Sequence, residues 1–294
     1  MLNSLAFLFK IKFGRAVFWM LLSCFAISLL AALGRLTGQI GVHPFQTVFC
    51  RILFAFLILL PFILQKGLQN IKTLQLKFYI LRAFIGMIAM WSWFYAITLI
   101  PIGDQTALSF LAPSFMTIGA ALIFRETVKS HRYIAVFAGF FGTFIILRPG
   151  ILEIDIGHLI ALLSAVAMGC SMLIIKKLTR HDETIIILFI SHLIMLPLAL
   201  IPAIVFWEWH GNFVWLLLFS TGPLAVIGHF SLTKAFSLTD VSFIAGIDYA
   251  RLPFAVLFGW ILFGEISDIW TWIGASIIFL SSLHSIRREI NLGE

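Results

Sequence analysis

The chain has 294 residues, of which 61% are hydrophobic and only 11% are charged, and its mean hydropathy is +1.07. Soluble domains carry about 25% charged residues, so this composition excludes an ordinary soluble domain and indicates a polytopic membrane protein. The net charge of +7 does not indicate nucleic-acid binding, because the lysines and arginines form short clusters between apolar runs rather than a continuous basic face.

The N-terminal segment has Lys10, Lys12 and Arg15 before an apolar run over residues 16–33, which resembles a secretory signal. The run is longer than the usual signal core and further apolar runs follow at once, so we predict a first transmembrane helix instead. The three cysteines lie inside apolar segments with no metal-ligand spacing, which favours packing roles over disulfides or a metal site.

Apolar windows and the polar breaks between them predict ten transmembrane helices, each near the ~20 residues that cross a bilayer core. The connecting loops are short and leave no room for a soluble domain, so the predicted class is an all-α polytopic membrane protein. The expected spans are residues 16–36, 44–64, 80–100, 104–124, 132–148, 157–176, 184–206, 213–234, 241–263 and 270–287.

The loop charges predict the orientation, because lysine and arginine are enriched in cytoplasmic loops. Most of them fall on one side of the predicted spans, and only Arg35 and Arg148 stand at span ends on the other. Both termini should therefore be cytoplasmic, as an even number of spans also requires, in a protein of the inner membrane. The residues counted as cytoplasmic are Lys10, Lys12, Arg15, Lys66, Lys72, Lys77, Arg82, Arg125, Lys129, Arg132, Lys176, Lys177, Arg180, Lys234, Arg287 and Arg288.

Two halves, residues 1–150 and 151–294, show a weak internal repeat. Because each half has five spans, an odd number, the second copy should be inverted across the membrane, as in many secondary transporters whose substrate site lies near the midplane. Sliding residues 96–126 along by 139 positions superimposes Ala96 on Ala235, Leu99 on Leu238, Phe115 on Phe254, Phe124 on Phe263 and Glu126 on Glu265.

Four segments resemble the drug/metabolite transporter superfamily, in its ten-span EamA-type branch. They are LRAFIGMIAMWSWFYAITLIPIGDQTALSFLAPSF at 81–115, IFRE at 123–126, KAFSLTDVS at 234–242 and YARLPFAVLFGWILFGE at 249–265. The resemblance implies two inverted five-helix repeats around a central cavity lined mainly by the first, third and fourth helices of each half, with the second and fifth helices further out. It leaves the substrate open among amino acids, nucleotide-related metabolites, S-adenosylmethionine, amines and drugs.

Asp248 and Arg251 lie inside the ninth predicted span, where an ionisable side chain costs roughly 2.5–3.5 kcal/mol even on the mildest scale. Three residues apart, they share a helix face, so they either neutralise each other or bind substrate or a proton. The matched first-half positions are Ser109 and Ala112, so the repeat itself does not require the charges. This asymmetry makes the pair a candidate substrate site.

For the other candidate substrate residues, the alternative to a functional role is a packing or structural role. Trp91 and Tyr95 share one face of the third span, which we expect to meet the cavity and a substrate ring. Ser109 donates either to substrate or to its own helix backbone. His229 is either a carrier of a coupled proton or a packing residue.

Four further charged or titratable residues are expected to have roles other than substrate binding. His192 should lie on a peripheral helix, and Arg51 should snorkel outward from the second span. Glu126 and Glu265 end helices at opposite faces, which predicts capping or gating. Pro113 and Pro253 interrupt helices expected to line the cavity and are the predicted hinges for rocking of one half against the other.

Together these features predict a secondary transporter of a small polar or zwitterionic metabolite, such as an amino acid or S-adenosylmethionine, with a drug or amine exporter as the alternative. An intramembrane enzyme is disfavoured, because the chain has no HExxH, GxSxG or GxxxxGK[ST] string. The expected partners are the metabolite, membrane lipid and a coupling proton, with a homodimer left open, and no nucleic acid, cofactor or metal.

Overall fold

The computed structural model describes residues 2–67, 73, 75–124, 130–148, 155–239, 244, 247–248, 250–266 and 268–291. Within these ranges the secondary structure is helical throughout, with no strand. The helices are α1 (Leu2–Gln39), α2 (Pro44–Lys66), α3 (Leu76–Leu99), α4 (Ile102–Ser109), α5 (Leu111–Phe124), α6 (Ser130–Leu147), α7 (Ile156–Leu178), α8 (Thr184–Val205), α9 (Asn212–Leu238), α11 (Arg251–Phe263) and α12 (Ile269–Asn291).

Each of the ten predicted spans has helix in its place, and the bounds agree within a few residues for most. Six helices, α1, α2, α3, α7, α8 and α9, are long and apolar enough to cross a bilayer on their own. The fourth span is divided into α4 and α5. The ninth contains α11, and much of its first half lies outside the described residues.

The fourth and ninth spans are interrupted at matching places. Phe110 separates α4 from α5 and donates its N–H to Ala107 O, three residues back (3.1 Å); Ala250 precedes α11 and donates to Ile247 O (2.9 Å). Pro113 and Pro253 are each the third residue of the helix that follows, where a missing N–H leaves no intrahelical bond unmade. The two prolines therefore lie just after the breaks, and the hinge role expected of them stays a prediction.

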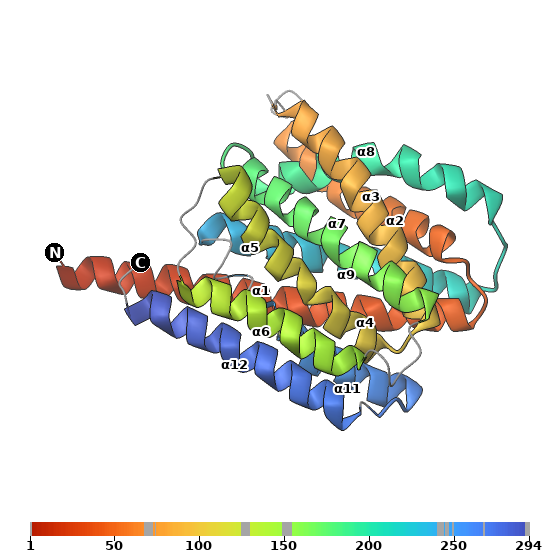
Figure 1. The fold of residues 1–294 in the computed structure, drawn as a ribbon. Helices are drawn as coiled ribbons and strands as arrows, with labels where there is room; N and C mark the ends of the chain where they lie inside the picture. Colours follow the sequence, from red (N-terminus) through yellow and green to blue (C-terminus); the bar gives the residue numbers. More distant parts are fainter. Residues whose placement is uncertain are drawn as a thin grey trace.

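The helices form one bundle in which helices from the first half of the chain pack on helices from the second (Figure 1). The main pairs are α1 with α9, α3 with α7, α2 with α8, α6 with α12, α5 with α7 and α1 with α11. Glycine permits the closest approaches: a Cβ on Gly169 of α7 would lie 2.8 Å from Ala112 O, and one on Gly222 of α9 would lie 2.5 Å from Phe54 Cβ. Both chain ends lie at the same end of the bundle (Figure 1).

Ion pairs and hydrogen bonds tie the two halves together at both ends of the bundle. At the end away from the termini, Arg35 of α1 pairs with Glu265, whose other oxygen accepts from Ile102 N (3.3 Å), and Arg148 pairs with Asp268. At the opposite end Tyr79 donates to Asp182 (2.8 Å). Glu265 thus links the two halves at this end, while its gating role stays a prediction, and Glu126 lies outside the described residues.

Candidate functional site

A cavity that is partly open to solvent lies in the middle of the bundle between the two halves of the chain. Its walls come from α1, α2, α3, α7, α8, α9, α11 and the short helical segment at Asp248. The second helix of each half, α2 and α8, therefore reaches the cavity, contrary to their expected peripheral position. Among the side chains that the structure describes, none that lines it belongs to α4 or α5, where the resemblance implied a contribution.

One wall of the cavity is aromatic and sulfur-rich. Trp93 and Phe94 of α3 are buried and pack edge to face with ring centroids 4.9 Å apart. Methionines from α3, α7 and α8 line the same cavity, and methionine packs well on ring edges and adapts to irregular shapes. These methionines are Met90, Met168, Met172 and Met195.

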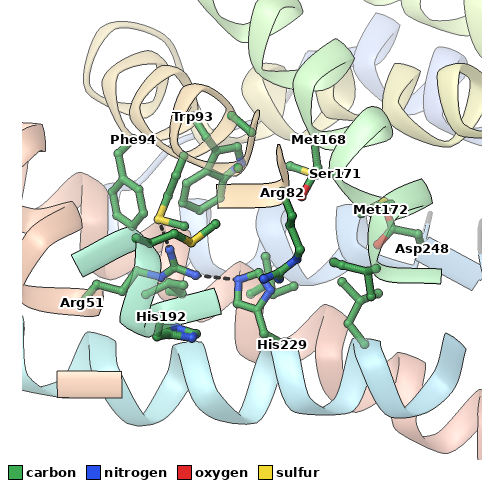
Figure 2. Close-up of a pocket in the computed structure, with 18 of the residues that line it drawn as sticks. Arg51, Arg82, Trp93, Phe94, Met168, Ser171, Met172, His192, His229 and Asp248 are labelled. Atoms are coloured by element: carbon green, nitrogen blue, oxygen red, sulfur yellow. Dashed lines mark hydrogen bonds between the residues drawn. The ribbon is translucent and has the colours of Figure 1, made fainter. Parts of the chain in front are cut away.

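Another part of the cavity lining is polar and cationic, and it consists of two arginines and two histidines. Arg51 of α2 and Arg82 of α3 are 2% and 5% exposed and point into the same part of the cavity, on either side of His229 (Figure 2). Arg51 lies with its Cζ 5.8 Å from the centre of the Phe94 ring, so the cationic group adjoins the aromatic wall.

The hydrogen bonds of this group set the histidine tautomers. Arg51 Nη2 lies 2.5 Å from His229 Nε2, and because a guanidinium only donates, His229 accepts there and carries its proton on Nδ1. His192 Nδ1 lies 2.8 Å from Leu188 O and donates to it, which leaves its Nε2 as an acceptor. Arg51 thus does not snorkel outward, and His192 is not peripheral.

Several buried nitrogens of the cavity residues make no hydrogen bond. They are Arg51 Nε, Arg82 Nε and Nη1, Arg251 Nε and His229 Nδ1, and all of them are donors. A buried donor without an acceptor costs free energy, so a ligand whose oxygen or nitrogen lone pairs accept from these N–H groups is stabilised in the cavity.

Asp248 and Arg251 both line the cavity and pair with each other. Arg251 Nη2 donates to Asp248 Oδ2 over 2.6 Å, and both side chains are almost fully buried. Ser28 of α1 donates to Arg251 O (3.1 Å), which fixes the start of α11 against the first half. The structure thus contains the mutual contact, while the expected contact with substrate stays a prediction.

The other predicted site residues lie away from the cavity wall. Trp91 and Tyr95 instead face a ring cluster near the start of α2, in which Phe45 lies 5.8 Å from Trp91 and 6.5 Å from Tyr95 between centroids. Ser109 donates to Gln105 O within α4 (3.0 Å), the alternative considered for it. Of the six predicted substrate residues, the cavity brings together Asp248, Arg251 and His229.

Sequence reasoning missed Trp93, Arg82, Arg51 and His192 as lining residues. The signal for two of them is a helical stripe on α3, in which Arg82, Gly86, Met90 and Trp93 recur every three to four residues and all line the cavity. Arg82 was counted as a loop cation, but it lies within α3 and is buried. Among the described residues no group of histidine, cysteine and carboxylate side chains forms a metal site.

Comparison with known proteins places this architecture in a family. The model of the EamA-like transporter family matches residues 14–148 and again residues 155–287. A riboflavin transporter of Vibrio cholerae is 31% identical over 90% of both chains, and one of Rhizobium johnstonii is 32% identical over 92% of this chain and 91% of its own. An S-adenosylmethionine uptake transporter of Rickettsia prowazekii is 29% identical over 92% of both chains.

A solved structure titled only as the crystal structure of a protein has the same fold, with a TM-score of 0.75 at 17% identity over 96% of this chain and 99% of its own. The fold, the central cavity and the two family matches agree with the motifs quoted from the sequence. The chain therefore belongs to the EamA-like transporter family and is a multi-pass membrane protein that transports a metabolite, not an enzyme.

Proposed function

We propose that this protein is a secondary transporter that carries an aromatic-ring metabolite through the central cavity by alternating access. The observation that carries the proposal is the pair of packed rings, Trp93 and Phe94, in a cavity between the two halves of the chain that four methionines also line. A planar ring can pack on this aromatic wall with favourable stacking and sulfur contacts.

The names of the relatives agree with a ring substrate. Riboflavin contains a flavin ring, and S-adenosylmethionine contains an adenine ring, so both kinds of relative are named for a ring-bearing metabolite. A simple amino acid, one of the substrates expected from the sequence, would leave this wall without a partner. For the substrate site we retain Asp248, Arg251 and His229 and add Trp93.

Two inverted repeats, residues 1–150 and 151–294, form the moving parts of the proposed cycle. The helix pairs support this division, because exchanging the halves turns the α1 and α9 pair into the α7 and α3 pair, and the α5 and α7 pair into the α11 and α1 pair. The breaks before Pro113 and Pro253 occupy equivalent places in the halves and supply the hinges.

The ring-binding part of the proposal is tested by removing the ring of Trp93. Purified Trp93→Ala should bind riboflavin and S-adenosylmethionine at least about tenfold more weakly than the wild type, since loss of a stacking partner in a buried site costs about 1–3 kcal/mol. Trp209→Ala is the matched control, because Trp209 is 82% exposed on the loop between α8 and α9. Wild-type protein that binds neither ligand would contradict the proposal.

Alternating access is tested by locking the tie at Arg35 and Glu265. In a chain freed of its native cysteines, Arg35→Cys and Glu265→Cys combined and joined by a short bifunctional reagent should stop uptake into proteoliposomes. A reducible reagent allows uptake to return on cleavage, and each single cysteine serves as a control. Uptake that continues at full rate after complete cross-linking would rule out rocking of the halves at this face.

A further inference from the structure

We propose that Arg82 and Arg51, with His229, form a binding site for oxygen acceptors on the edge of the substrate ring, and that this site selects an uncharged or anionic substrate over a cationic one. The inference rests on the proposed function and narrows its substrate class. Between the two ring types considered above, it favours a flavin-type ring, which carries carbonyl oxygens, over an adenosyl sulfonium.

The charges around the cavity are the first step of the argument. Among the described residues its lining contains three guanidinium groups and one carboxylate, and that carboxylate, Asp248, is already paired with Arg251. Within the described part of the chain, Arg51 and Arg82 make no ion pair with a carboxylate. A buried cation without a counter-charge is strongly unfavourable, so a ligand that brings negative charge or lone pairs to this place is stabilised, and a second cation is repelled.

The hydrogen-bond donors also favour a ligand with lone pairs, and this argument does not depend on net charge. Arg82 Nε and Nη1 and His229 Nδ1 are buried donors without acceptors, and the histidine proton is placed on Nδ1 because Arg51 occupies Nε2. A guanidinium presents neighbouring N–H groups in a planar fork that matches a carbonyl or carboxylate oxygen. A substrate bearing such oxygens satisfies donors that the protein leaves open.

Position connects these donors to the ring wall. Arg82 and Trp93 lie on the same stripe of α3, and Arg51 lies against the Phe94 ring. In Figure 2 the two guanidinium groups and His229 lie in one row below Trp93 and Phe94. A ring packed on the aromatic wall therefore directs its edge towards the donors, whereas Asp248 lies at the far side of this row.

The test compares riboflavin, which is uncharged and carries ring carbonyls, with S-adenosylmethionine, whose net charge is positive. Both are titrated into purified full-length protein in detergent, by flavin fluorescence and by calorimetry. Wild-type protein should bind riboflavin at least about tenfold more tightly, and Arg82→Gln should weaken riboflavin binding by about tenfold or more while improving the ratio for S-adenosylmethionine. Arg82→Lys keeps the charge but loses the planar fork of N–H groups, so its affinity for riboflavin should lie between those of the wild type and Arg82→Gln.

Arg15→Gln is the matched control, because Arg15 is exposed on α1, directly before the first predicted span, and does not line the cavity. Should Arg82→Gln fail to elute as a folded monodisperse protein, competition between the two ligands on the wild type gives the selectivity without any variant. Equal affinity for both ligands, or unchanged riboflavin binding by folded Arg82→Gln, would overturn the acceptor site while leaving the ring proposal intact. Failure of the wild type to bind either ligand would instead overturn the proposed function.

Discussion

At the scale of single residues, Asp248 and Arg251 show the two opposing free energies of a buried charge pair, the attraction between the charges and the cost of removing both from water. Their 2.6 Å contact satisfies one carboxylate oxygen and one guanidinium nitrogen, yet both side chains are removed from water at considerable cost. Removing one partner leaves the other as an uncompensated buried charge, whereas removing both also removes the desolvation cost. The mutual contact neutralises the two charges, and a role of the pair in substrate binding can be separated from it by experiment.

We predict that Asp248→Asn alone lowers the stability of the purified protein by about 3–5 kcal/mol, because Arg251 then stays buried without its counter-charge. The double variant Asp248→Asn with Arg251→Gln should recover most of this loss. The measurement is a double-mutant cycle on thermal unfolding in detergent, read with and without riboflavin. A substrate role for the pair would be abandoned if the double variant kept the full ligand-induced shift.

Residues on the third span show which part of the site a sequence can supply. Aromatic character and four-residue spacing selected Trp91 and Tyr95, but helical spacing alone does not say which of several faces meets a cavity. The direction of the face is set by neighbours distant in sequence, here α7 and α8, whose contacts with α3 no local pattern encodes. A polar residue inside a span usually faces the interior of the bundle. The stripe of residues that starts at buried Arg82 therefore identifies the face of α3 that lines the cavity.

At the scale of elements, hydropathy predicted the spans because the bilayer fixes their length, and the structure places helices within a few residues of most of them. The same patterns did not predict that α2 and α8 line the cavity, because both are apolar around most of their circumference and carry one arginine or histidine each in their interior. These residues are Arg51 and His192. How closely two helices approach is decided instead by small residues at their contact.

Gly169 allows a test of helix approach. We predict that Gly169→Ala lowers the stability of the protein by about 1–3 kcal/mol, because the new Cβ would lie 2.8 Å from Ala112 O and α5 and α7 must separate. Gly14→Ala is the control within α1, since a Cβ there meets nothing within 4 Å, and it should leave the stability unchanged or raise it by up to about 1 kcal/mol. Melting temperatures in one detergent give both values, and equal shifts would show that α5 and α7 are not closely packed.

At the scale of the whole molecule, the uneven distribution of basic residues between the two ends of the bundle and the position of the chain ends indicate the same orientation in the membrane. Both termini lie at the end of the bundle that carries Lys176 and Lys177 in the last turn of α7 and Arg180 just after it, while Arg35 and Arg148 pair with acids at the other end. Arg82 must be removed from the cytoplasmic count because it lines the cavity, and the asymmetry survives its loss. We infer that the lysine-rich end is cytoplasmic in an inner-membrane protein.

The two ends of α8 give the sharpest test of this orientation. His181 precedes α8 and Trp209 follows it, and both are exposed, so a single cysteine at each position reports on one face of the membrane. In a chain without Cys24, Cys50 and Cys170, an impermeant maleimide should label Trp209→Cys in spheroplasts, since that loop faces outward in our orientation. His181→Cys should react only after the membrane is permeabilised, because the loop between α7 and α8 is cytoplasmic. The reverse pattern would invert the topology, and with it the face closed by Arg35 and Glu265, because an even number of spans ties every loop to the same decision.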